Sequence, residues 1–139
     1  MFGIVDTQHT PSLGYMEIVD RRNAATLLPI IQSHTRPGSI IRTDEWAAYN
    51  RISSIPGVAA HETVNHSLHF VDPATLVHTQ NVESYWNRVK TKLKRMKGVT
   101  REQLPSYLDE FMWRERKAKT HGVALTAIMN AIADVYPLP

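Results

Sequence analysis

The order of the predicted strands and helices is the feature that most constrains how this 139-residue chain folds. Its first half alternates short β-branched segments with short helical ones, separated by Pro, Gly and Asn. Its second half carries longer patterns in which apolar residues recur every three or four positions, as on one face of a helix. Strands that alternate with helices, followed by helices alone, indicate a mixed α/β fold with helices packed on a sheet.

The individual elements follow from local spacing and turn residues. The predicted strands span residues 2–6 and 14–20, which form a hairpin, and residues 39–44 and 61–66. Asn23 is a suitable N-cap for a helix over residues 24–31, in which Pro29 predicts either a kink or a later start. A second short helix is expected to begin at Glu45. Three further helices are predicted over residues 82–96, 104–112 and 123–135.

Charge is concentrated in one part of the chain. The net charge is +3, but residues 81–120 alone hold eleven basic and five acidic residues. A concentrated basic segment suits a polyanion such as nucleic acid, although a solvated helix face has the same composition. Helical geometry predicts that Arg88, Lys92 and Arg95 point to the solvated side, opposite the apolar stripe of their helix.

Several classes of protein are excluded by composition. The chain has no Cys, so disulfides and Cys-based zinc sites are absent. No run of about 18 apolar residues is present, so we expect no contact with a membrane. The first residues lack the basic and apolar regions of a signal peptide, so secretion is not expected. The expected location is the cytoplasm of a bacterium or the nucleus of a eukaryote.

Two acidic residues are candidates for chemistry. Asp44 closes an apolar strand, and in open α/β sheets the carboxyl ends of strands line the ligand crevice. Glu83 opens the long basic helix. At about 100° per residue, Glu83 and Lys90 lie at nearly the same angle, beside the apolar stripe and roughly 10.5 Å apart along the axis. A favourable interaction with the helix N-terminus also explains Glu83, so spacing alone leaves both interpretations open.

Several motifs resemble one known family. They are Thr43 to Tyr49 (TDEWAAY), His61 to Ser67 (HETVNHS), Phe70 to Pro73 (FVDP), His78 to Trp86 (HTQNVESYW) and Leu108 to Arg114 (LDEFMWR). In this order they resemble the Merlin superfamily of DDE transposases and its bacterial insertion-sequence relatives of the ISXO type. The resemblance runs from about Phe2 to Arg116, which is most of the chain.

The resemblance implies a ribonuclease-H-like mixed sheet flanked by helices over residues 1–120. The apolar pattern of residues 123–135 predicts a helical extension over residues 121–139. It also implies Mg²⁺- or Mn²⁺-dependent cleavage and joining of DNA, at transposon ends and target. Asp44 and Glu83 correspond to the second and third metal-binding catalytic acids, with Asn81 a less favoured third ligand. Lys90 corresponds to a DNA contact. The other expected DNA-binding cations are Lys94, Lys97, Arg88, Lys92 and Arg95, and the expected positioning residues are His78, Thr79, Gln80 and Asn81.

One part of the family pattern is missing. The family's first catalytic acid lies on a strand between the hairpin and the strand that ends at Asp44, and this sequence begins just after that strand. Asp6 lies at the wrong end of its strand to replace this acid, and Asp20 is too far from Asp44. We therefore expect an N-terminally truncated domain. Its sheet must close up, borrow a strand from another chain or stay partly unformed, with marginal stability or homo-oligomerisation as the consequence.

The missing acid leaves three functions open: a DDE transposase catalytic domain, a catalytically inactive DNA-binding remnant, or a basic interaction module. Other constellations are weaker. Zinc binding by His61, His66, His69 and His78 is not favoured, because these residues lie on a strand and a loop without Cys. Trp46 fits either the core or a DNA contact.

Overall fold

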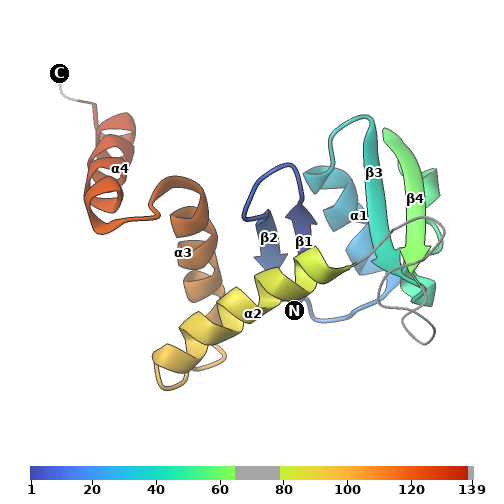
Figure 1. Cartoon of the computed structure of the whole chain (residues 1–139), viewed down its shortest axis with the longest axis horizontal. Coiled ribbons are helices and arrows are strands. Elements are labelled where there is room, and N and C mark those ends of the chain that lie inside the picture. Colours follow the sequence, from blue (N-terminus) through green and yellow to red (C-terminus); the bar gives the residue numbers. More distant parts are fainter. Residues whose placement is uncertain (65–78, 138–139) are drawn as a thin grey trace.

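The computed structural model describes residues 1–64 and 79–137, which form a mixed α/β structure (Figure 1). In chain order its strands and helices are β1 (Phe2–Asp6), β2 (Leu13–Glu17), α1 (Ala24–His34), β3 (Ser39–Asp44), β4 (Val58–Val64), α2 (Gln80–Arg95), α3 (Leu104–Lys117) and α4 (His121–Val135). Two short 3-10 helices, η1 (Ala47–Tyr49) and η2 (Ile52–Ser54), connect β3 to β4. No described helix is long and apolar enough to cross a bilayer.

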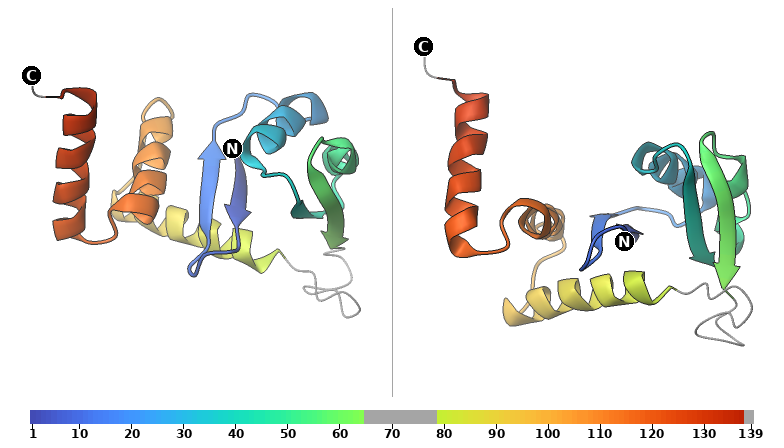
Figure 2. Two further views of the ribbon diagram at one scale, coloured as in Figure 1. Left: turned by 90° about the horizontal axis from the view of Figure 1, so that it is seen from above. Right: turned by 45° about the horizontal axis from the view of Figure 1, so that its top comes forward.

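The strands form two separate two-stranded sheets within the described residues. β1 and β2 pair antiparallel with Ile4 opposite Tyr15, and β3 and β4 pair parallel with Asp44 opposite Val64. β1 is the hairpin strand on the side of β3, yet the two do not pair (Figures 1 and 2). The expected single mixed sheet is therefore not formed. Within the described residues the sheet has therefore not closed up, and a strand borrowed from another chain stays a prediction.

One core lies under α1, which joins the hairpin to β3. Asn23 caps this helix, because its side-chain oxygen accepts a hydrogen bond of 2.9 Å from the backbone N–H of Thr26. Leu27 and Ile31 are buried on one face of α1. They belong to an apolar cluster with Phe2, Ile41, Ile52 and Ile55. This cluster is what holds the two sheets in one body.

The second core joins the hairpin to α2 and α3. Its buried members are Met16, Tyr85, Val89, Leu108, Phe111 and Met112. Gly14 allows the close approach of α2, because a Cβ atom there would lie only 2.7 Å from the ring of Tyr85. α2 crosses the hairpin, with its amino end on the side of β3 and its carboxyl end on the side of α3 (Figures 1 and 2).

The predicted elements are largely confirmed, with differences at their ends. The second hairpin strand ends at Glu17, so Asp20 lies beyond it, and β4 begins at Val58, three residues before the predicted start. The helix expected from Glu45 is reduced to the 3-10 turn η1. The helices predicted in the second half are present, and α3 continues five residues further, to Lys117.

Candidate functional site

Asp44 ends β3 with its side chain exposed to solvent. Its Oδ1 accepts a hydrogen bond of 3.2 Å from the backbone N–H of Trp46. One residue earlier, Thr43 Oγ1 is hydrogen-bonded at 2.8 Å to Nε2 of His61 on β4, and burial lowers the pKa of that histidine. The two parallel strands are thus tied together immediately before Asp44, which leaves its carboxylate at a fixed strand end and open to ligands.

An aromatic group stands beside Asp44. The guanidinium of Arg22 lies 5.0 Å from the centroid of the Trp46 ring, and the ring of Tyr49 meets Trp46 edge-on at 5.3 Å. Burial raises the pKa of Tyr49, and the Asp44 carboxylate raises it further. Trp46 stays 36% exposed, so it is not a core residue. Arg22 is not among the residues predicted from the sequence, because no local spacing links it to a tryptophan 24 positions away, and Tyr49 is present there only as the last residue of a family motif.

Glu83 lies in the first turn of α2, also with an exposed side chain. This turn is closed by the carbonyl of Thr79, which accepts hydrogen bonds from the backbone N–H groups of Val82 and Glu83. In all three views the amino end of α2 points toward the carboxyl ends of β3 and β4, while the helix itself packs mainly on β1 (Figures 1 and 2). The element that carries Glu83 is thus directed toward the strand end that carries Asp44, without packing closely on it. His78, expected to position this helix, lies outside the described residues.

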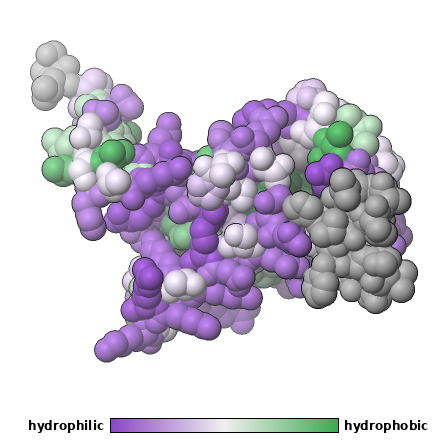
Figure 3. Space-filling view, in the orientation of Figure 1, coloured by the Kyte–Doolittle hydropathy of each residue, from purple (hydrophilic) through white to green (hydrophobic). Residues whose placement is uncertain are grey.

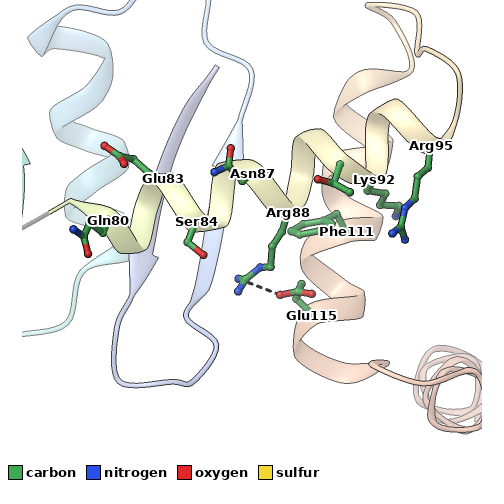
Figure 4. A pocket seen from close by; sticks show the side chains of 10 residues that line it. Gln80, Glu83, Ser84, Asn87, Arg88, Lys92, Arg95, Phe111 and Glu115 are labelled. Carbon is green, nitrogen blue, oxygen red and sulfur yellow. Dashed lines mark ion pairs between the residues drawn. The ribbon is translucent and has the colours of Figure 1, made fainter. Parts of the chain in front are cut away.

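A pocket of about 660 Å³, lined mostly by polar residues, follows α2 toward α3 (Figure 4). α2 lines it with a row of uncharged and charged side chains: Gln80, Glu83, Ser84, Asn87, Arg88, Thr91, Lys92 and Arg95. Phe111 and Glu115 of α3 complete its wall. Asp44 is not among the lining residues, so the two candidate acids do not share this pocket.

Two cationic side chains expected on the solvated side of α2 instead form contacts with the hairpin and with α3. Arg88 donates a hydrogen bond to the carbonyl of Ser12 and forms a 3.2 Å ion pair with Glu115 of α3 (Figure 4). Lys92 pairs at 2.9 Å with Glu110. The predicted orientation is wrong for these two residues, because α3 packs along that flank of the helix and supplies the acids.

The remaining cations of this segment are exposed. Lys90, Lys94, Arg95 and Lys97 have no ion-pair partner within residues 1–64 and 79–137. Lys97 adopts a left-handed backbone conformation, with φ of 59°, where the chain turns after α2. The structure therefore separates cations that hold the fold from cations that are available to a polyanion.

The described residues contain no group of three or more His, Asp or Glu side chains placed to share a metal ion. Asp44 and Glu83 offer the hard oxygen ligands that Mg²⁺ and Mn²⁺ prefer, but they supply two carboxylates where a third is needed. Carboxylate oxygens are therefore the right kind of ligand for Mg²⁺ or Mn²⁺. Two carboxylates alone do not complete such a site. Of the four histidines considered for zinc, His66, His69 and His78 lie outside the described residues.

Comparison with known proteins identifies the family. Residues 1–116 match the ISXO2-like transposase domain. A protein of Haemophilus influenzae named "Uncharacterized transposase-like protein" is 32% identical over 100 residues, which cover 72% of this chain and 78% of that relative. No solved structure matches the chain. DDE transposases typically use divalent metal ions, and their substrate is DNA. The resemblance inferred from the motifs is thus confirmed, and this chain belongs to the ISXO2-like family of DDE transposase domains.

Proposed function

We propose that this chain is a transposase catalytic domain that cleaves and joins DNA, with Asp44 and Glu83 as two of its metal-binding acids. The observation that carries the proposal is that the amino end of α2 points toward the carboxyl end of β3, and each of these ends bears an exposed carboxylate (Figure 1). Neither carboxylate is in an ion pair within the described part of the chain, in contrast to Glu110 and Glu115. Both are therefore available to a cation.

The position of each side chain suggests whether it binds metal or DNA. Asp44 and Glu83 would hold the divalent ions, which when bound activate the attacking hydroxyl and stabilise the leaving oxygen of an in-line displacement. Lys90 lies on the same helix, about two turns beyond Glu83, and would contact a phosphate of the bound strand. Trp46 donates its backbone N–H to Asp44, and the Arg22 guanidinium lies over the Trp46 ring, so these two side chains would contact the DNA next to the cleaved bond.

The finer fold is also part of this proposal. We infer a ribonuclease-H-like sheet in which one further strand, carrying the first acid of the family, lies between β1 and β3. Support comes from the two unjoined sheets, which present β1 and β3 toward each other without pairing (Figure 2). A strand in this place would pair with both edges, and its acid would lie in the next strand position from Asp44, about 4.8 Å away.

The test is metal-dependent nicking of supercoiled DNA by the purified chain in Mn²⁺, with calorimetric Mn²⁺ binding as a readout independent of activity. We expect Asp44→Asn and Glu83→Gln to lower nicking at least ~100-fold and to weaken Mn²⁺ binding, because each removes a ligand. Glu45→Gln and Glu102→Gln remove exposed acids of the same type and serve as controls. Nicking that survives in both ligand variants, or falls equally in the controls, contradicts the assignment.

A second function is favoured by one observation, the lack of a third acid near Asp44 and Glu83 among the described residues. The chain would then be an inactive remnant that binds DNA through its exposed cations. In that case no variant or metal produces nicking, while DNA binding weakens steeply with salt. Each phosphate contact adds about 0.9 to the slope of log K against log salt, so Lys90→Ala should lower that slope by about 1.

A further inference from the structure

α4 carries an apolar face that nothing in the described structure covers. Positions three, four and seven apart lie on one side of a helix, and here they hold large apolar residues. The set consists of Leu125, Ile128, Met129, Ile132, Val135 and, just past the helix end, Tyr136, with exposed fractions between 42% and 73%. We call it the α4 stripe. Apolar side chains are visible at the surface of this helix in Figure 3. Apolar surface of this kind on a soluble protein commonly marks a binding site.

The fold itself makes no use of the α4 stripe. α4 packs on α3 with its small residues inward: Ala124 is buried and Ala127 is half-buried. The helix stands at the end of the molecule opposite β3 and β4, so a partner bound there leaves the candidate site open (Figures 1 and 2). It also lies beyond residues 1–116, the part that matches the family. The stripe therefore calls for a partner other than the DNA or metal of the proposed function.

The lack of Lys and Arg in α4 argues against a membrane or a strongly charged molecule as the partner of the α4 stripe. The ionisable residues of α4 are His121 and Asp134, and the α4 stripe contains no charge. Helices that lie on membrane surfaces carry Lys and Arg on their polar face, and α4 has neither, so a lipid surface is a poor match. A strongly charged partner would form no ion pair with the stripe. A second copy of the chain brings an equally apolar and uncharged face of the same length.

We propose that the α4 stripe pairs with the α4 stripe of a second copy in an antiparallel two-helix contact. With the two-fold axis level with residue 130, Leu125 lies opposite Val135 of the second copy and Ile128 lies opposite its Ile132. Large apolar side chains then meet in four successive layers. The antiparallel direction also opposes the two helix dipoles.

The charges that precede α4 favour the same direction. A basic cluster ends just before the helix and consists of Arg114, Arg116, Lys117 and Lys119. A parallel pair would bring both clusters together. An antiparallel pair separates them by the length of the 15-residue helix, about 22 Å, which is more than twice the Debye length of about 8 Å at physiological salt.

The size of the stripe sets the expected affinity. The helix face is about 22 Å long and about 10 Å wide. Because side chains make this surface uneven, its accessible area is larger than the flat product, and pairing buries roughly 400 Å² on each copy. The total of roughly 800 Å² falls below the ~1,200–2,000 Å² of a standard stable interface. We therefore expect a reversible dimer with a Kd of roughly 10–100 μM, on the order of a transient complex.

Sedimentation velocity of the full chain over a concentration series tests the proposal without DNA or metal, so it is independent of the proposed function. We expect a monomer–dimer equilibrium for the wild type. The double variant Ile128→Glu/Ile132→Glu should raise the Kd at least ~100-fold, because pairing would bury four carboxylates. Thr126→Glu/Asn130→Glu adds the same charge to the opposite, exposed face and should leave the Kd unchanged. Circular dichroism checks that both variants keep their helix content.

Disulfide cross-linking tests the direction, which the absence of Cys makes straightforward. Leu125→Cys mixed with Val135→Cys should give a cross-linked dimer, while each variant alone should give none. Cross-linking of each variant with itself would instead show a parallel pair and overturn the geometry. A wild type that is monomeric up to about 200 μM, or a stripe variant that still dimerises, would overturn the proposal itself.

Discussion

Replacement of Arg88 by Ala is the perturbation whose effect the structure defines best. The guanidinium links α2 to two other elements, through the carbonyl of Ser12 in the hairpin and the carboxylate of Glu115 in α3. It also lies 5.1 Å from the centroid of the Tyr85 ring. The side chains of Arg88 and Glu115 are 26% and 24% exposed, so this ion pair is only weakly screened by solvent.

The expected loss of stability is about 2–4 kcal/mol. A hydrogen bond from a charged donor contributes about 1.5–3 kcal/mol, and a cation–π contact at a partly exposed site contributes about 0.5–1 kcal/mol. Loss of Arg88 also leaves the buried Oε2 of Glu115 without its counter-ion. Arg42 pairs with Glu62 on the exposed face of β3 and β4. Arg42→Ala is therefore the matched control, and it should lower the free energy of unfolding by only about 0.2–1 kcal/mol.

Urea unfolding followed by circular dichroism measures both losses. Glu115→Ala should also destabilise, and the double variant Arg88→Ala/Glu115→Ala should lose less than the sum of the single variants, with a coupling energy of about 1 kcal/mol or more. A loss of stability for Arg88→Ala no larger than that for Arg42→Ala would contradict a structural role for Arg88. The same holds if Glu115→Ala leaves stability unchanged and strengthens DNA binding, since Arg88 would then be a DNA contact for which Glu115 merely competes.

Two further predictions concern packing and pH. Gly14→Ala should destabilise by roughly 1–3 kcal/mol, because its Cβ would lie 2.7 Å from the ring of Tyr85, whereas Gly122→Ala meets nothing within 4 Å and should be neutral or slightly stabilising; thermal melting compares the two. Hydrogen bonds from Lys92 and Arg114 lower the pKa of Glu110 below 4.5. Its stabilising contribution is therefore complete above about pH 4.5 and is lost as the pH falls through the lowered pKa. Glu110→Gln should make stability less dependent on pH in this acidic range, and an unchanged dependence would contradict the pKa assignment.

Most elements can be predicted from the sequence because their signals are local. The hairpin, the Asn23 cap and the apolar face of α2 all depend on residues within a few positions of one another, and each is present. Ends of elements were less predictable. Residues 18–20 continue the sequence alternation of β2, but they have no pairing partner in β1. The first residue of β1, Phe2, already pairs with Glu17. Strand length was thus set by the partner strand and not by the strand's own sequence.

The candidate site shows the same limit. Asp44 and Glu83 are predicted from strand-end and helix-start positions together with family motifs, and the amino end of α2 points toward the carboxyl end of β3 (Figure 1). Arg22 was missed, because its contact with Trp46 depends on how α1 and β3 return the chain to the same place. Contacts of this kind come from tertiary packing and carry no signal in local spacing.

The cations of α2 show how packing converts one sequence pattern into two roles. At about 100° per residue, Arg88 and Lys92 lie on one flank of the apolar stripe, and Lys90 and Lys94 lie roughly 160° away on the other. Both flanks are equally basic in sequence, but α3 covers only the first, where Glu110 and Glu115 neutralise its charges. Removal of a cation from the covered flank should therefore loosen α2, whereas removal of one from the open flank should weaken only the hold on a polyanion. If Glu83 acts at the amino end of this helix, the covered flank fixes its position and the open flank is left to bind DNA.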